Sequence, residues 1–428
     1  MRRTIGNALE STTLKCARIA VDIGSTVVKI ARLDSNGEVE SQQLVPRDFE
    51  AGIARQVESL LERCDAVLEA EEVLVCSSAN GGLQVGIVCL SKRFSGAVMR
   101  NQVLLAGANP VFVHDFDEEG GSLTHVDILL VGGGVNCEDS IHLERRLRRF
   151  DPKRYQFGSL VYAGNSHLAS LFAELFSNAA IVSNPLADEL GGRSLSVFEA
   201  VRRAFLDDLV YKEGVSELKG SLSTGIHPTP EIVSRGFQRA LANSSAIKLS
   251  GPCVVLDIGG ATTDLHYTVE VVRDDSEERP SPGVSAARFV FTDLGIAASR
   301  QRLVLQLRSH PRLYEFLTCV LDDNIQDVYQ TLREGEWEPP PLLLSYACLF
   351  IALDRFAHGK GPGLPTADLA RIEQVLLTGG ASQAMREEVI ARVLGLFRSE
   401  NNGVPAIFID RRYQLWVDGI TWSGQASM

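Results

Sequence analysis

Two similar glycine-rich phrases contain the residues of this chain that are best suited to grip a phosphate group. The first reads VDIGST from Val21, and the second reads LDIGGATT from Leu256. Glycine lets the backbone approach a phosphate and point its N–H groups at it, and hydroxyl side chains add further donors. We therefore expect phosphate contacts from both phrases, at Gly24, Ser25, Thr26, Gly259, Gly260, Thr262 and Thr263.

Each phrase also carries an aspartate at the end of an apolar run, Asp22 in the first and Asp257 in the second. A carboxylate is costly in such a place unless it has partners, and its oxygens suit a hydrated Mg²⁺. The alternative is that each aspartate only caps its own turn. Because the two aspartates hold the same place in paired phrases, we expect both to be catalytic. They would position Mg²⁺ through water, and one would orient the attacking water.

Two further charged residues lie close to these phrases. Asp264 has two open roles, one in contact with Mg²⁺ or a lysine and one purely structural. Lys29 follows the first phrase on a predicted strand. If side chains alternate along that strand, Lys29 and Thr26 face opposite sides. We therefore expect Lys29 to face solvent or cover the sheet rather than to bind phosphate.

A third glycine turn follows the apolar run 375–377 late in the chain. Small residues there would let an adenosine lie against the backbone, and a helix N-terminus favours phosphate. The alternative is a tight strand-to-helix turn without a ligand. We expect nucleoside contacts from Gly379, Gly380, Ala381 and Ser382. The run 127–134 shows a similar strand and glycine turn after the first phrase, which indicates a duplicated unit.

The elements that must position these turns are short strands. The first phrase lies between the strand-like runs 18–23 and 27–33, and the second between 253–257 and 264–272, so each forms the tip of a β-hairpin. Helices and strands alternate elsewhere, which is typical of an α/β class with mainly parallel strands. Two facing hairpins would clamp phosphates from both sides. The sequence therefore predicts duplicated actin-like ATPase (ribonuclease H-like) domains with a nucleotide cleft between them.

We place the domain boundaries by this repeat. Residues 1–17 are expected to be a flexible N-terminal segment. Residues 18–250 would form the first actin-like domain, with a helical crossover over 212–250, and residues 251–428 the second. In the second domain we expect a short strand at 415–417.

Bulk properties exclude several classes of protein. The 428 residues are 45% hydrophobic and 22% charged, as in a folded chain of two or three domains. The net charge of −12 disfavours a nucleic-acid partner. No unbroken apolar run reaches the roughly 18 residues of a membrane helix, and no secretory signal is recognisable, so we expect a cytoplasmic protein. The eight scattered cysteines are expected to be mostly buried, reduced thiols.

Taken together, the motifs resemble those of the glutamate mutase MutL family. These are ATPases encoded beside adenosylcobalamin-dependent mutases, distinct from the DNA-repair proteins of the same name. The resemblance runs from about residue 18 to the C-terminus, in VDIGST from Val21, CSSANGGL from Cys76, VYAGN from Val161, DIGGATTDLH from Asp257, DLG from Asp293 and LTGGA from Leu377. The chain departs from the family pattern at Val27-Val28, where an aromatic is usual, and at Gly133–Asn136, where the family has Thr-Asp-Gly-Gly.

The resemblance implies a reactivating chaperone that binds ATP with Mg²⁺ and hydrolyses it slowly. Its partners would be the subunits of an adenosylcobalamin-dependent mutase, with no nucleic acid and no membrane. Two other classes stay open, a small-molecule kinase or amidohydrolase-like transferase and an ATP-binding actin-like scaffold. The sequence does not assign the client mutase, the residue that aligns the water or the oligomeric state, for which a homodimer is one option.

Overall fold

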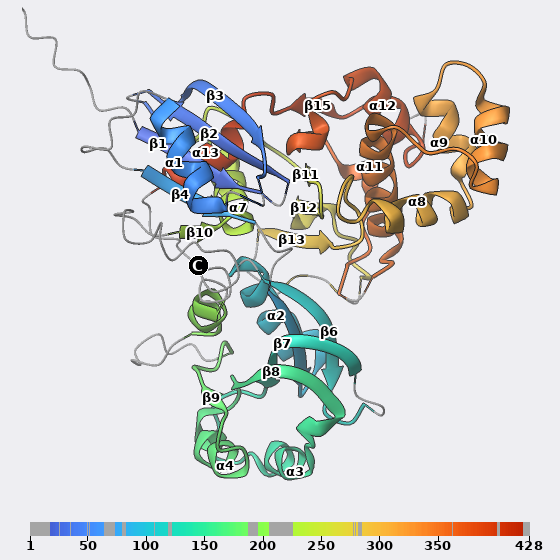
Figure 1. Ribbon diagram of the computed structural model, residues 1–428. Coiled ribbons are helices and arrows are strands. Elements are labelled where there is room, and N and C mark those ends of the chain that lie inside the picture. Colours follow the sequence, from blue (N-terminus) through green and yellow to red (C-terminus); the bar gives the residue numbers. More distant parts are fainter. Residues whose placement is uncertain are drawn as a thin grey trace, which may run out of the picture.

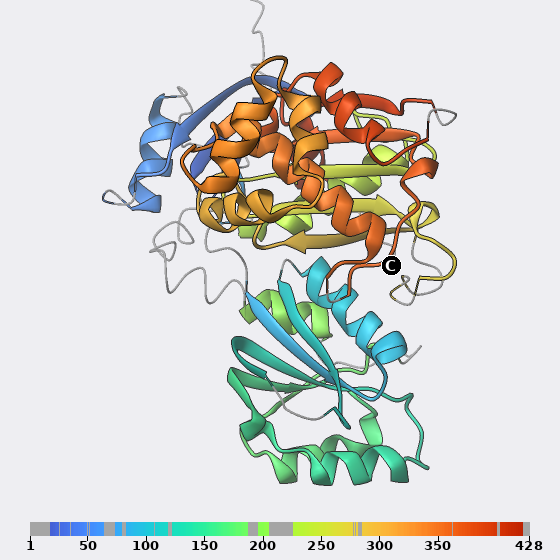
Figure 2. The same cartoon turned by 90° about the vertical axis from the view of Figure 1, so that its right-hand side faces the viewer.

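We describe the protein from a computed structural model. The structure describes residues 18–422 apart from 25, 35, 49, 51, 64–72, 79–82, 107, 119–121, 187–195, 205–225, 277, 279, 281–284, 362 and 400–402. Three five-stranded sheets organise this part of the chain. Figures 1 and 2 show two sheets and their helices in the upper part of the molecule and the third sheet in a separate lobe below.

The first sheet is built around the hairpin of the first glycine phrase. β1 pairs antiparallel with β2, β2 antiparallel with β3, and β4 and β10 continue in parallel on the other side of β1. Helix α1 (Ile53–Arg63) packs Val57 and Leu60 into the core cluster of this sheet. The strands in sheet order are β10 (Ile226–Pro228), β4 (Val73–Ser77), β1 (Arg18–Ile23), β2 (Val27–Leu33) and β3 (Val39–Pro46).

The second sheet repeats this plan around the second phrase. β11 pairs antiparallel with β12, β12 antiparallel with β13, and β14 and β15 follow in parallel beyond β11. Two sheets with the same order and strand directions confirm the predicted fold of duplicated ribonuclease H-like domains, as in actin-like ATPases. The strands in sheet order are β13 (Ala286–Phe291), β12 (Thr263–Thr268), β11 (Cys253–Ile258), β14 (Gln374–Thr378) and β15 (Ala406–Ile409).

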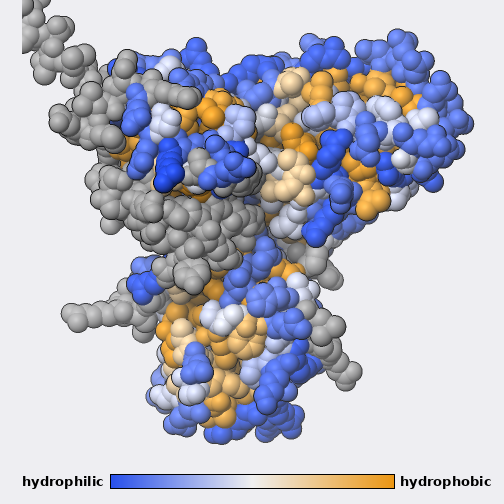
Figure 3. Space-filling view, viewed as in Figure 1, coloured by the Kyte–Doolittle hydropathy of each residue, from blue (hydrophilic) through white to orange (hydrophobic). Residues whose placement is uncertain are grey.

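A third sheet, which we call the inserted sheet, lies between β4 and β10 in the chain. All of its strand pairings are parallel. The helices α2 (Ala97–Leu105), α3 (Ile141–Arg149) and α4 (Ala169–Leu175) belong to this lobe, and Figure 3 shows apolar residues gathered over it. The strands in sheet order are β6 (Asn109–Asp115), β5 (Gln84–Cys89), β7 (Ser122–Gly132), β8 (Tyr155–Tyr162) and β9 (Ala180–Ile181).

The inserted sheet corrects one step of the sequence argument. The run 127–134 is not the counterpart of the strand and turn at Gly379, because its strand is the end of β7 of the inserted sheet. The strand that lies parallel to β1, as β14 lies parallel to β11, is β4. The inference of a duplicated fold was right, but the pairing of the run 127–134 with the glycine turn at Gly379 was wrong. Buried parallel strands that end in glycine look alike in sequence.

Two helices fill the space between the first and second sheets. α7 (Thr229–Leu241) and α13 (Gln414–Ile420) share a buried cluster with residues from both sheets. They cross so closely that a Cβ on Gly236 would lie 1.9 Å from the carbonyl oxygen of Leu415. The predicted strand at 415–417 is therefore wrong. Its apolar residues are buried on a helix, and a short apolar run does not distinguish a strand from a buried helix.

The outer helices of the second domain pack around α11. α11 is the one helix in the described ranges that is long and apolar enough to cross a membrane, but 72% of that stretch is buried inside the protein. Leu349 and Phe350 of α11 belong to the cluster that contains the second sheet. The helices are α8 (Arg300–Ser309), α9 (Leu313–Val320), α10 (Ile325–Glu334), α11 (Pro341–His358) and α12 (Glu387–Gly395).

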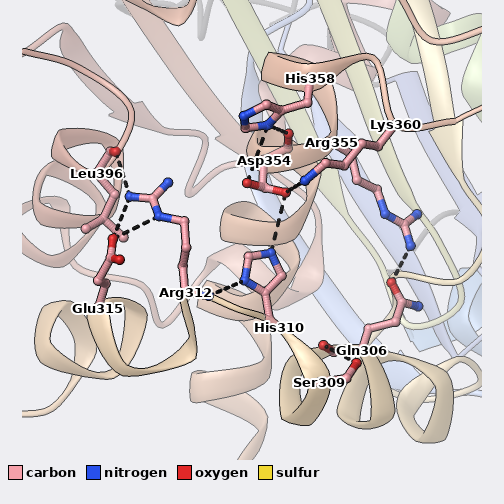
Figure 4. A network of polar contacts seen from close by, with 10 residues as sticks. All are labelled: Gln306, Ser309, His310, Arg312, Glu315, Asp354, Arg355, His358, Lys360 and Leu396. Atoms are coloured by element: carbon pink, nitrogen blue, oxygen red, sulfur yellow. Dashed lines mark hydrogen bonds and ion pairs between the residues drawn. The ribbon is translucent and has the colours of Figure 1, made fainter.

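A buried carboxylate fastens the C-terminal end of α11 to the connection between α8 and α9 (Figure 4). Asp354 Oδ2 lies 2.9 Å from Lys360 Nζ and 3.4 Å from His310 Nε2. His358 Nδ1 lies 3.5 Å from the other carboxylate oxygen. Burial of Asp354 opposes its ionisation, but the hydrogen bonds from His310 and Lys360 outweigh this effect and lower its pKa. This network stabilises the outer part of the second domain.

The cysteines follow the expectation in part. Cys76, Cys89, Cys253, Cys319 and Cys348 are buried free thiols, whereas Cys137 is exposed. Cys16 and Cys64 lie outside the described residues, as do the N-terminal segment 1–17 and Ser25.

Candidate functional site

A cavity of about 310 Å³ lies between the first and second sheets. Both hairpin turns, the late glycine turn and the start of α7 contribute to its wall. The predicted residues that line it are Asp22, Gly24, Thr26, Asp257, Gly259, Gly260, Thr262, Gly379, Gly380 and Ala381. The structure therefore brings together residues that are more than 350 positions apart in the sequence.

The two hairpin turns face each other and have the same local geometry. In each turn a glycine N–H donates to a carbonyl three residues later, from Gly24 to Val27 and from Gly259 to Thr262, both at 2.9 Å. The tips touch, since a Cβ on Gly260 would lie 2.7 Å from Thr26 Cγ2. Such backbone turns suit a phosphate chain held from both sides.

The late glycine turn meets the second hairpin at its aspartate. Gly379 has φ +87°, which side chains rarely adopt, and a Cβ on it would lie 2.3 Å from Asp257 Oδ1. A Cβ on Gly380, by contrast, would meet no heavy atom within 4 Å. This turn therefore offers bare backbone to the cavity while it packs against Asp257.

Asp22 of the first hairpin is fully engaged by neighbours. Its Oδ2 accepts a hydrogen bond from Lys29 Nζ at 2.7 Å, and its Oδ1 accepts one from Thr229 Oγ1 at 2.7 Å. Burial alone would lower the pKa of Lys29, but the carboxylates of Asp22 and Asp257 outweigh it, so the pKa is raised and Lys29 stays charged. The ammonium also lies 4.9 Å from the ring centre of Tyr413.

Asp257 of the second hairpin has no such partner. It lines the cavity, and among the described residues none donates a hydrogen bond to its carboxylate. Burial raises its pKa to about 7. Lys29 counteracts this effect, and the carboxylates of Asp264 and Asp22 add to it. A carboxylate with a raised pKa that faces a cavity is typical of a group that binds a cation or moves a proton.

A polar row continues from Asp257 across the second sheet. Asp264 lies directly opposite Asp257 on β12, and it is ion-paired with the buried Arg288 of β13. His266, two residues further along β12, is buried, and its pKa is well below the usual range because of burial and the charge of Arg288. All three side chains line the same cavity. The row therefore extends the polar wall beyond the glycine turns.

The arrangement offers one open carboxylate to a cation. Within the described ranges, no group of three or more His, Cys, Asp or Glu side chains is placed to hold a metal ion. Mg²⁺ does not need one, because it keeps several waters and binds through one or two carboxylates and substrate phosphates. Asp257 fits that role. Asp22 fits it less well, since Lys29 and Thr229 already occupy its oxygens.

Comparison with known proteins identifies the family. A family model described as MutL protein matches residues 18–420. This chain belongs to the MutL protein family. A MutL protein of Clostridium tetanomorphum is 27% identical in an alignment of 313 positions that covers 66% of this chain and 65% of that protein. The chain thus spans about 65% of the length of the curated relative that it matches.

Solved structures are similar to this MutL-family chain at low identity. Component A of the (R)-2-hydroxyglutaryl-CoA dehydratase of Acidaminococcus fermentans is 11% identical, with a TM-score of 0.36 and coverage of 95% of this chain and 96% of that chain. The activator of the 2-hydroxyisocaproyl-CoA dehydratase of Clostridium difficile, with bound ADPNP, is 9% identical, with a TM-score of 0.34 and coverage of 94% and 92%. The fold assignment of this MutL-family chain rests on its own strand order.

Two residues predicted to contact the nucleotide, Thr263 and Ser382, direct their hydroxyl groups to backbone carbonyls of this MutL-family chain. Thr263 is fully buried, and its hydroxyl donates to the carbonyl of Leu294 at 2.8 Å. Ser382 is also buried, and its hydroxyl donates to the carbonyl of Gly379 at 2.9 Å. Neither hydroxyl points into the cavity in this structure, and the ligand contacts expected of Thr263 and Ser382 stay predictions. Thr263 follows Thr262 on an extended strand, so the two side chains point to opposite faces.

Other residues reach the cavity although the sequence argument did not place them there. Lys29 lines it, contrary to expectation, because Lys29 and Asp22 are direct cross-strand partners and share a face. Thr26 lies in the turn, where strand alternation does not apply. Thr229 and Arg288 were missed altogether. Counting the register back from the hairpin turn would have placed Lys29, but no local signal marks the other two.

Proposed function

We propose that this chain is a slow ATPase that binds Mg-ATP between its two hairpin turns and serves an adenosylcobalamin-dependent mutase as a reactivating chaperone. The single observation that carries the nucleotide part is the open carboxylate of Asp257 between two facing glycine turns. Membership of the MutL family supports the mutase part. Such a role belongs in the cytoplasm.

The residues divide the work of phosphate binding by their chemistry. Backbone N–H groups of the turns at Gly24 and Gly259 would cradle the phosphate oxygens, and Lys29 would neutralise negative charge from the side of the first sheet. Gly379 and Gly380 would let the nucleoside lie against bare backbone. Mg²⁺, when bound, supplies positive charge that stabilises the charge spreading over the transferred phosphoryl group.

Asp257 would act next to the terminal phosphate. Its raised pKa means that it changes protonation state near neutral pH, which suits a group that holds a metal-bound water or accepts a proton from the attacking water. In the described residues no competing donor has to be displaced from it first. Asp22 would act through Lys29, as the residue that fixes the ammonium.

The chaperone step would follow from cleft closure. A ligand that contacts both hairpins binds the closed arrangement more tightly than an open one, so it shifts the equilibrium towards closure. Hydrolysis would remove contacts to the terminal phosphate and let the two sheets separate. A slow turnover is adequate for such a switch.

The test is ATP turnover by purified protein, wild type against Asp257→Ala, with and without a cobalamin mutase that holds inactivated cofactor. Slow hydrolysis that requires Asp257, together with recovery of mutase activity, supports the proposal. Turnover without rescue contradicts the chaperone role for that mutase and leaves the ATPase. Tight binding of ATP with neither turnover nor rescue contradicts both and favours a scaffold.

One observation favours a second candidate, a small-molecule kinase. Beyond the glycine turns the cavity reaches His266, which is 1% exposed, and its Nε2 has no hydrogen-bond partner in the part of the chain that the structure describes. A neutral imidazole there could bind a polar acceptor molecule. Transfer of ³²P from γ-labelled ATP to a small molecule in a metabolite mixture, lost in His266→Ala, would establish this alternative.

A further inference from the structure

One buried guanidinium links helix α2 of the inserted sheet to the wall of the candidate ATP cavity, which Asn109 of β6 also lines. Arg288 Nε donates to Asp264 Oδ1 at 2.7 Å, and Nη2 donates to the same oxygen. Arg288 Nη1 donates to the carbonyl of Leu104 at 2.9 Å. Leu104 lies in the last turn of α2, the helix of the inserted sheet that is nearest to the second domain. One side chain thus joins the cavity wall to another lobe of the molecule.

The hydrogen bond from Arg288 to the carbonyl of Leu104 is stabilised by the position of that carbonyl at the end of helix α2 and by the burial of Arg288. The last carbonyls of a helix lack partners within the helix and carry the negative end of its dipole, so a cation is stabilised there. Arg288 is only 7% exposed, so its charge needs compensation on every side. Asp264 supplies part of that compensation and Leu104 the rest. Losing either partner would leave donors of a buried guanidinium unpaired.

A second arginine holds α2 at a site away from the cavity. Arg100, in the middle of α2, donates to the carbonyl of Gly363 and lies 3.2 Å from Glu278 Oε2. Both partners belong to the second domain. Arg100 is 4% exposed and does not line the candidate ATP cavity. The two arginines therefore dock the same helix, but only Arg288 also faces the ligand.

We propose that Arg288 couples binding of a terminal phosphate in the cavity to the docking of α2, and so to the position of the inserted sheet. The inference rests on the proposed ATP function. Asp257 and Asp264 are direct cross-strand partners. Arg288 lies opposite His266 on the next strand, diagonally from Asp264, and its side chain reaches the Asp264 carboxylate. A phosphate held beside Asp257 lies near the one buried guanidinium of this row and competes with Asp264 and Leu104 for its donors.

The direction of the effect follows from the geometry of the guanidinium. Arginine presents its donors in a rigid fork, so turning the fork towards a phosphate removes Nη1 from the carbonyl of Leu104. Binding of ATP then loosens the last turn of α2, and by linkage an undocked α2 binds ATP more tightly. ADP lacks the terminal phosphate and leaves the bond to Leu104 in place. The inserted sheet would therefore be released in the ATP state and held again after hydrolysis.

The experiment is hydrogen–deuterium exchange over residues 97–105 of the full chain, without nucleotide, with ADP and with a non-hydrolysable ATP analogue. In wild type we expect the analogue, but not ADP, to raise exchange in the last turn of α2 by about tenfold, the effect of losing one charged hydrogen bond. Arg288→Lys keeps the charge beside Asp264 and lacks the fork. It should show the raised exchange already without nucleotide, and no further response.

Arg100→Lys is the matched control. It removes the other fork from the same helix, so exchange in α2 rises without nucleotide, but the response to the ATP analogue persists. Calorimetry on the same samples reports whether nucleotide binds. Binding to wild type without a response of α2 overturns this inference alone, and absence of binding overturns the proposed function together with it.

Two further outcomes also count against the inference. If the last turn of α2 exchanges equally fast in Arg288→Lys and in wild type without nucleotide, the bond to Leu104 does not hold α2 in place. A response to the analogue that is as large in Arg288→Lys as in wild type refutes the coupling. If Arg288→Lys does not fold, the contrast between the analogue and ADP in wild type still decides the question.

Discussion

Replacing Asp257 by asparagine should make the nucleotide-free protein more stable at neutral pH while it removes tight binding of Mg-ATP. None of the described residues donates a hydrogen bond to this carboxylate, and burial, with smaller contributions from the charges of Asp264 and Asp22, raises its pKa to about 7. An amide of the same shape carries no charge and avoids the cost of burying one. A residue that only capped its turn would show the opposite result, because its loss would destabilise the protein.

The size of the effect follows from proton linkage. In the unfolded chain Asp257 ionises near its ordinary pKa, so above about pH 4 the folded state holds a proton that the unfolded state has lost. Stability therefore falls as pH rises from about 4 to about 7 and is constant above that range. Between pH 5 and pH 8 the ceiling is about 3 kcal/mol, and water in the open cavity reduces it to about half of that value.

The assay is urea denaturation of wild type and Asp257→Asn at pH 5 and pH 8 without nucleotide. The other titrating groups are common to both proteins, so the difference between their pH dependences isolates Asp257. We expect the variant to gain 1 to 2 kcal/mol on wild type between the two pH values, roughly the linkage figure. Equal pH dependences, or a variant that is less stable at pH 8, would refute the reasoning.

Asp22→Asn is the matched contrast, since Asp22 holds the equivalent place in the first hairpin. Its carboxylate accepts hydrogen bonds from Lys29 and Thr229, so its removal leaves a buried ammonium without its partner. We expect a loss of about 3 kcal/mol in the free energy of unfolding. Two equivalent aspartates would then have opposite effects on stability.

Three further predictions follow from other contacts. Lys29→Met should weaken ATP binding by at least about tenfold in calorimetry, since it removes a positive charge from the cavity wall. Gly236→Ala should cost about 3 kcal/mol or more in urea denaturation, because its Cβ would lie 1.9 Å from the carbonyl oxygen of Leu415, and an unchanged midpoint would contradict the close crossing of α7 and α13. Asp354→Asn should cost about 2 kcal/mol at pH 7. Because the pKa of Asp354 is lowered, wild type loses this stabilisation as pH falls below about 4, so the two proteins should converge in acid.

The sequence predicted the hairpins and their turns because those features are local. An apolar run, a glycine turn and a second apolar run determine β1 with β2 and β11 with β12 without help from the rest of the chain. The sequence did not predict that the inserted sheet is separate from the first sheet, because the pairing of distant strands is not a local property. It also did not predict the helix at 414–420, a short apolar segment that is helical where α7 buries it.

The sequence predicted the residues of the site that lie in glycine turns, and missed those that lie elsewhere. The backbone ligands were recognisable from glycine, and most of them line the cavity. Thr229 and Arg288 come from α7 and β13, and neither lies in a glycine turn or beside one. Their roles depend on the approach of two sheets and a third lobe, and a single sequence contains no local mark of such an approach. The contact of Arg288 with Leu104 spans 184 positions.

The difference between the two halves of the site depends on one residue at an equivalent place. In the first hairpin the residue opposite Asp22 is Lys29, and in the second the residue opposite Asp257 is Asp264. Lys29 neutralises Asp22, whereas burial, together with the charge of Asp264, raises the pKa of Asp257 and leaves its carboxylate without a donor among the described residues. The two hairpin turns are similar, but the aspartate of the first has a charged partner within the protein, whereas the aspartate of the second is left to bind a ligand. In the proposed function, the half that lacks an internal partner is the half that senses Mg-ATP.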